Sequence, residues 1–149
     1  PKNKDFLDQI YFAFAGLSKN EGDEFRQIEY LNRSVQASTT NVNQKAISYL
    51  ELGKIAFDKR EYRTAQAYYD STTSNLPNDH PDYVEILARR NSLTKLVKNL
   101  RTIENEDSLQ RLSNMTPAEQ QAMIDQVLQK EEEEKKHKQE NDAKKAVKD

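Results

Sequence analysis

The chain has 149 residues, of which 32% are charged and 35% hydrophobic, and its formal net charge is -2. A charge so close to balance gives no general attraction to nucleic acid or to an anionic membrane surface, and the absence of cysteine excludes disulfides and thiolate zinc sites. The small apolar fraction suits a thin helical array better than a wide globular core.

Two helices are predicted in the first forty residues. Apolar residues recur with helical spacing between Phe6 and Leu17. The following Asn20-Glu21-Gly22-Asp23 predicts a turn in which Gly22 adopts a positive φ. A second helix is expected from Glu24 to Ala37, and the polar residues 38–43 are expected to form a loop.

The same pattern recurs in the middle of the chain. Helices are expected at 46–58 and 62–76, with Lys59-Arg60-Glu61 as the turn and Pro77 as the stop. A longer helix is expected from about residue 82 to 104, followed by a separate shorter segment that carries Leu109, Leu112 and Met115.

The C-terminal part begins with a strong helix-start signal. In Thr116-Pro117-Ala118-Glu119, Thr116 and Glu119 match a capping box and Pro117 suits the first helical position. One apolar stripe follows, and then residues 130–149 carry seven lysines and seven acidic residues, several of them spaced i,i+4. We expect this charged tail to be either a solvated helix or a frayed end. The stripe consists of Met123, Ile124, Val127 and Leu128.

A repeat organises the first two thirds of the chain. The segment from Ala46 to Pro77 is similar to the tetratricopeptide repeat, with small residues where two antiparallel helices cross closely. An aromatic position recurs at Tyr11, Tyr49 and Tyr83, which predicts two repeats followed by a capping helix. The fold class is therefore all-α, with a helical array over 1–114 and an amphipathic, then charged, helix over 115–149. The matching repeat positions are Tyr49, Leu52, Gly53, Ala65, Tyr69 and Pro77.

The chain also resembles one particular family. The stretches QKAISYLELGKIAF, YRTAQAYYDSTTSNLP, HPDYVEILARRNSLTKLVKNLRTIENEDSLQRLSNM and PAEQQAMID are similar to the tetratricopeptide lipoproteins of the PorW/SprE family. These proteins belong to the type IX secretion and gliding-motility machinery of Bacteroidetes. The resemblance implies a periplasmic scaffold at the outer membrane that binds other secretion components. It also implies that the chain is an internal segment, with further repeats and a lipid anchor upstream.

The repeat register predicts a protein-binding groove along the first helix of each hairpin. An apolar strip there would hold an extended or helical peptide. The alternative is that the chain's own C-terminal helix covers the strip through Met123 and Val127. The predicted groove residues are Phe12, Ile47, Leu50, Lys54, Phe57 and Val84.

No catalytic, metal or cofactor site is predicted. His80 lies in a proline-rich turn and His137 in a charge run, so surface or capping roles are favoured over metal binding. The leading hypothesis is a non-enzymatic scaffold of an envelope secretion complex. The alternative is a generic intracellular adaptor or co-chaperone, although Phe12, Gly16 and Glu51 replace the residues of a carboxylate clamp. A third class, a repeat domain appended to an enzyme, stays open, and no apolar run reaches bilayer-spanning length.

Overall fold

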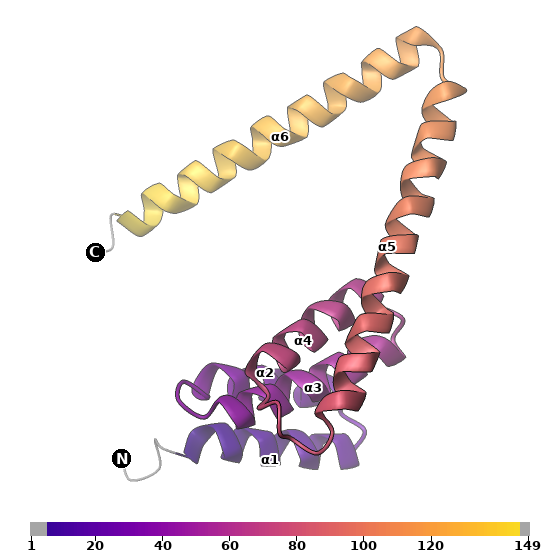
Figure 1. The fold of residues 1–149 in the computed structure, drawn as a ribbon. Coiled ribbons are helices and arrows are strands. Elements are labelled where there is room, and N and C mark those ends of the chain that lie inside the picture. Colours follow the sequence, from indigo (N-terminus) through magenta and orange to yellow (C-terminus); the bar gives the residue numbers. More distant parts are fainter. Residues whose placement is uncertain (1–5, 147–149) are drawn as a thin grey trace. The chain divides into compact units, whose positions relative to one another are not determined.

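The computed structural model describes the backbone of residues 6–146 and the side chains of residues 6–140, and this part of the chain contains helices and no strand (Figure 1). The all-helical prediction is confirmed. The helices are α1 (Leu7–Asn20), α2 (Glu24–Ala37), α3 (Val42–Asp58), α4 (Tyr62–Asn75), α5 (Tyr83–Ser113) and α6 (Pro117–Ala146).

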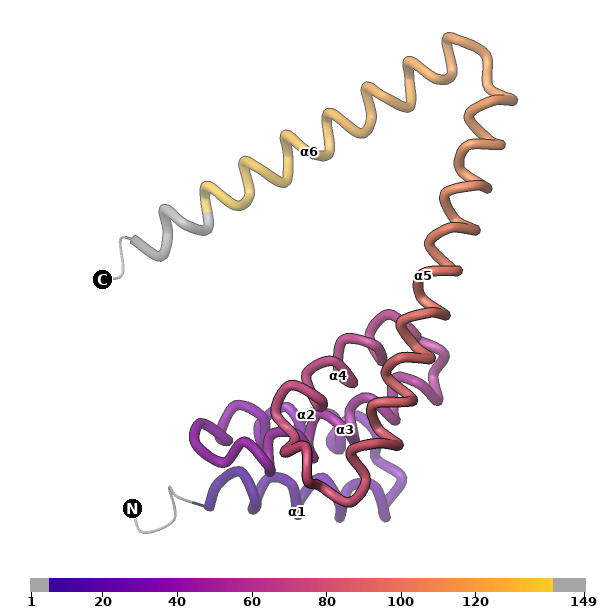
Figure 2. Tube along the Cα trace, in the orientation of Figure 1, coloured from indigo at the N-terminus to yellow at the C-terminus, as the bar shows by residue number. Residues whose placement is uncertain are grey.

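The chain divides into two compact units, residues 1–101 and 102–149, with the division inside α5. In the first unit, α1 and α2 form hairpin 1, and α3 and α4 form hairpin 2 (Figure 2). The first turns of α5 pack on hairpin 2, where Ile86 and Leu93 join a buried cluster around Tyr69. Arg90 Nε also donates a hydrogen bond to Asp70 Oδ1 of α4 at 2.5 Å.

Most of the predicted helix boundaries hold, and two do not. The range of α2 matches the prediction, and Gly22 has a φ of 74° in the turn before it. However, α3 begins at Val42 rather than Ala46, because Asn41 caps it by accepting a hydrogen bond from the Gln44 amide at 3.1 Å. The predicted separate segment near residue 110 is wrong, since α5 continues unbroken to Ser113 through a stretch without glycine or proline.

The two hairpins bury the same positions. Each buried residue of hairpin 1 has a buried counterpart 38 residues later, including the small pair Ala15 and Gly53. At Gly53 an added Cβ would lie 3.0 Å from the ring of Tyr69, so α3 and α4 cross closely there. Arg60, the counterpart of Gly22, likewise has a positive φ of 62°. The paired positions are 8/46, 15/53, 18/56, 27/65, 31/69, 34/72 and 38/76.

A buried polar network joins the first three helices. Ser34 Oγ of α2 lies 2.8 Å from Ser48 Oγ of α3 and donates a hydrogen bond to the Asp8 carbonyl of α1 at 2.8 Å. Ser38 Oγ donates to Asp8 Oδ2 at 3.3 Å. The two bonds to Asp8 tie α1 to the end of α2, and the Ser34–Ser48 bond links hairpin 2 to hairpin 1. Losing one partner would be costly because it leaves a buried polar group unsatisfied.

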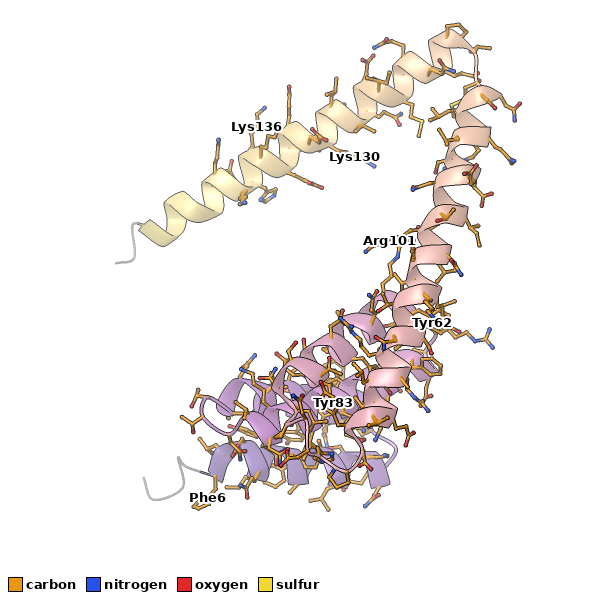
Figure 3. The ribbon with its side chains drawn as sticks, in the orientation of Figure 1. Phe6, Tyr62, Tyr83, Arg101, Lys130 and Lys136 are labelled. Atoms are coloured by element: carbon orange, nitrogen blue, oxygen red, sulfur yellow. The ribbon has the colours of Figure 1, made fainter. Side chains whose placement is uncertain are left out.

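The second unit contains the end of α5 and all of α6. The capping box forms as predicted, with the Thr116 amide and hydroxyl both donating to Glu119 Oε2 at 2.8 Å. Every side chain described from residue 121 to 140 is exposed, and Lys130 and Lys136 project outward from α6 (Figure 3). The described charged residues therefore form a solvated helix. Of the helices described, none combines the length and apolar character needed to cross a membrane.

Candidate protein-binding surfaces

Three of the predicted groove residues line one open cleft in the first unit. Leu50, Lys54 and Phe57 stand on one face of α3, and the beginning of α5 supplies the other wall. Their spacing of three and four residues places them on successive turns of one helix face. The cleft has a volume of about 470 Å³, and the other residues lining it are Asp58, Tyr69, Asp82, Glu85, Ile86 and Arg89.

Buried and aromatic side chains form the base of the cleft. Tyr69 and Ile86 are both buried, and Phe57 packs edge-on against Tyr62 with 5.7 Å between ring centroids. Burial raises the pKa of the Tyr69 hydroxyl, and the positive charge of Arg89 partly offsets that rise. The Arg89 guanidinium also lies 5.9 Å from the centroid of the Phe57 ring, within cation–π range. The protein thus holds the arginine against two aromatic side chains.

The mouth of the cleft carries charges of both signs. Lys54 Nζ pairs with Glu51 at 2.6 Å, and Glu51 also lies 3.6 Å from Lys19 of α1. The carboxylates that line the cleft come from both walls: Asp58 from α3, Asp82 from the turn before α5 and Glu85 from α5 itself. An apolar base with a rim of mixed charge suits an amphipathic polypeptide segment better than a small anion.

The other predicted groove residues do not join this cleft. Phe12 packs instead against the buried cluster formed by Ala15, Leu31 and Leu52, where the two hairpins meet. Ile47 is half-buried outside the cleft, and Val84 is 77% exposed and does not line it. A binding role for these three residues stays a prediction.

The sequence predicts that the helix now seen as α5 contributes Val84 to the groove, whereas its residues that line the cleft are Glu85, Ile86 and Arg89. The spacing between Tyr49 and Tyr83 places Ile86 at the position that Leu52 occupies in hairpin 2, so its inward direction could have been derived. The position of Arg89 depends on its contacts with Phe57 and Tyr69, which no local pattern reveals.

A second apolar surface lies within the second unit. Leu109 and Leu112 of α5 face the predicted stripe of α6 across an open groove of about 620 Å³. Gln120 Nε2 donates to the Leu112 carbonyl at 2.8 Å and holds the bend between the two helices. The members of the stripe, Met123, Ile124, Val127 and Leu128, all remain partly exposed.

The histidines and acidic residues form no metal site in the described part of the chain. No three of the His, Asp or Glu side chains described there converge as metal ligands. His80 accepts a hydrogen bond from the Asp82 amide at its Nδ1 atom at 3.2 Å, which is a capping role before α5. His137 lies among the charged side chains of α6.

Comparison with known proteins adds no family assignment. The sequence matches none of the known protein-family models, and none of the curated proteins matches it either.

Proposed function

We propose that the chain is a tetratricopeptide-type scaffold that holds a segment of a partner protein in the cleft between α3 and α5. The observation that carries this proposal is that Leu50, Lys54 and Phe57 lie together in one cleft. The repeat register assigns them to a ligand-facing strip, and they line one cleft together with the buried side chains of Tyr69 and Ile86. Such a cleft binds through a few buried side chains surrounded by a polar rim.

Two further observations support the tetratricopeptide type. Gly53 and Ala65 provide the close crossing that this repeat requires, and the aromatic ring of Tyr69 fills the space beside it. The buried positions of the two hairpins also recur in register, as expected for tandem copies of one structural unit.

We further propose that this scaffold serves the type IX secretion and gliding machinery of the bacterial envelope. The support is the resemblance of residues 44–57, 62–77, 80–115 and 117–125 to the PorW/SprE lipoproteins. On this proposal the protein acts in the periplasm at the outer membrane, through a lipid anchor outside this chain. Its partners would be other secretion components. It has no enzymatic activity and needs no cofactor.

The alternative is an intracellular adaptor or co-chaperone with the same fold. The residues Phe12, Gly16 and Glu51 stand where carboxylate-clamp domains carry lysine and asparagine. This difference disfavours a co-chaperone that holds a terminal carboxylate and leaves a generic adaptor as the rival.

Equilibrium binding of display-selected peptides tests the cleft. Peptides are selected for binding to the full chain, and their affinities are then measured for the Phe57→Ala and Phe25→Ala variants. Phe25→Ala is the control, because Phe25 is 79% exposed and lies outside the cleft. We expect about tenfold weaker binding or more for Phe57→Ala, because losing a buried aromatic anchor costs at least about 1.4 kcal/mol. Equal affinities for the two variants would refute the cleft as the binding site.

Cell fractionation of the full-length gene product tests the location. We expect the product to be lipid-modified and to remain with the outer membrane. A product without a lipoprotein signal that stays in the cytosol would favour the adaptor instead.

A further inference from the structure

Two buried positions of hairpin 2 lack buried counterparts in hairpin 1. Ser48 and Leu52 are buried, whereas Ile10 and Phe14, which lie 38 residues earlier, are more exposed. The contrast is largest at one pair, because Leu52 is 2% exposed and Phe14 is 43% exposed. All other buried positions of hairpin 2 up to residue 76 have buried counterparts in hairpin 1.

The contacts of α3 explain this difference. Ser48 Oγ pairs with Ser34 Oγ of α2, and Leu52 packs with Ala15 and Leu31. Tyr49 and Ile55 pack against the same cluster. These α3 residues are thus covered by the hairpin that precedes them, and their counterparts on α1 have no such cover among the described residues.

We name the counterparts on α1, Ile10, Tyr11, Phe14 and Leu17, the open face. Leu17 is 57% exposed. Both aromatic rings of the open face pack against α2, with the ring centroids of Phe14 and Tyr11 5.4 Å and 6.5 Å from that of Tyr30. Two of the four side chains of the open face are therefore positioned by contacts within hairpin 1.

The same positions are covered again at the next step along the chain. Tyr83 and Ile86 follow Tyr49 and Leu52 by 34 residues, and both pack against the cluster of hairpin 2. The same kind of packing is thus formed twice, by α3 against hairpin 1 and by α5 against hairpin 2.

We propose that the open face is a stacking surface for one further helical hairpin of the same repeat type, placed ahead of α1 in the order in which hairpin 1 precedes hairpin 2. Its second helix would present a small and aliphatic face, as α2 does with Leu31, Ser34 and Val35. This inference rests on the repeat type of the proposed function. It is a property of the array and requires no partner in the cleft.

A second copy of the chain cannot supply that hairpin in the same order. The surface of α4 that corresponds to the stacking face of α2 is already covered by α5, through Ile86, Leu93 and the Arg90–Asp70 ion pair. The remaining way to pair two copies is face to face, with α1 against α1, which would be a different interface.

A tandem extension tests the proposal. Residues 6–43 of the chain are duplicated between residues 5 and 6, which reproduces the existing spacing of the hairpins. The natural chain has no tryptophan, so Phe14→Trp in the original copy is a single reporter. The matched control is Phe25→Trp, because Phe25 and its counterpart Arg63 are both exposed.

We expect the Phe14→Trp emission maximum to move to shorter wavelength in the extended chain, and the Phe25→Trp maximum to stay unchanged. Adding Leu17→Glu to the extended chain should reverse the shift. An unshifted Phe14→Trp maximum in the extended chain would overturn the proposal. So would a shift in the unextended chain that grows with protein concentration together with dimer formation, since that outcome means face-to-face pairing.

The outcome is independent of the cleft. If the emission shift is absent in the extended chain but Phe57→Ala still weakens peptide binding, only the stacking surface is refuted. If the shift occurs but Phe57→Ala leaves peptide binding unchanged, only the proposed binding site is refuted.

Discussion

Replacing Gly53 with alanine tests the close crossing of α3 and α4. In an open helix interior this change is favourable by about 1 kcal/mol, because alanine has the higher helix propensity. At Gly53 the new Cβ would lie 3.0 Å from Tyr69 Cδ2, 3.1 Å from Cε2 and 3.4 Å from Tyr68 Cβ. Tyr69 is buried and its environment includes Arg89, so the ring has little room to move.

Overpacking of this kind costs about 1–3 kcal/mol. We therefore expect a net loss of about 1 kcal/mol for Gly53→Ala, or a midpoint lower by roughly 4–8 °C for a unit of this size. Gly16→Ala is the matched control, since Gly16 also lies inside a helix but an added Cβ there meets nothing within 4 Å. This control should be stabilised by about 0.5–1 kcal/mol. Thermal unfolding followed by circular dichroism measures both, and stabilisation of equal size in the two variants would refute the close crossing.

Three further predictions concern the turns, the start of α6 and the tail. Gly22→Ala should destabilise the fold by about 1 kcal/mol and Arg60→Gly should stabilise it by a smaller amount, since both positions have a left-handed φ; urea unfolding that gives the two changes the same sign would contradict this. The two hydrogen bonds from Thr116 hold the pKa of Glu119 below its ordinary value. The stability that Glu119 gives to the start of α6 is therefore present above that ordinary value and is lost as the pH falls through the lower pKa of the folded state. Amide hydrogen exchange around residue 117 should show this loss of protection in acid, and Glu119→Gln should not show it. Truncation after Lys130 should leave the thermal midpoint nearly unchanged because the described side chains beyond it are all exposed; a large drop would mean that the charged helix is part of the folded core.

Much of the fold could be predicted because local signals agree with it. Asn20-Glu21-Gly22-Asp23 defines the first turn, and Pro77 ends the second hairpin. The capping box at Thr116 depends on residues only three positions apart, so the sequence contains all the information needed. Where the boundary of α3 was misplaced, Asn41 with Gln44 three residues later was a usable capping signal.

The contacts between hairpins were less predictable because they depend on residues far apart in the chain. The network of Asp8, Ser34 and Ser48 becomes visible only when α1, α2 and α3 are packed together, since each residue alone would suit an exposed position. Phe12 was assigned to the groove by register, yet it packs at the junction of the hairpins. Leu50, Lys54 and Phe57 line one cleft, and their proximity could be predicted because spacing along one helix face determines it.

Site-specific photo-crosslinking in the native cell tests the scaffold function most directly. A photoreactive amino acid is placed at Phe57, in the cleft, and in a separate protein at Phe25, which is exposed outside it. We predict that the Phe57 position forms a discrete crosslink to one envelope protein of the secretion machinery and that the Phe25 position does not. Identical crosslinking patterns from the two positions, or none from Phe57, would contradict a partner held in the cleft.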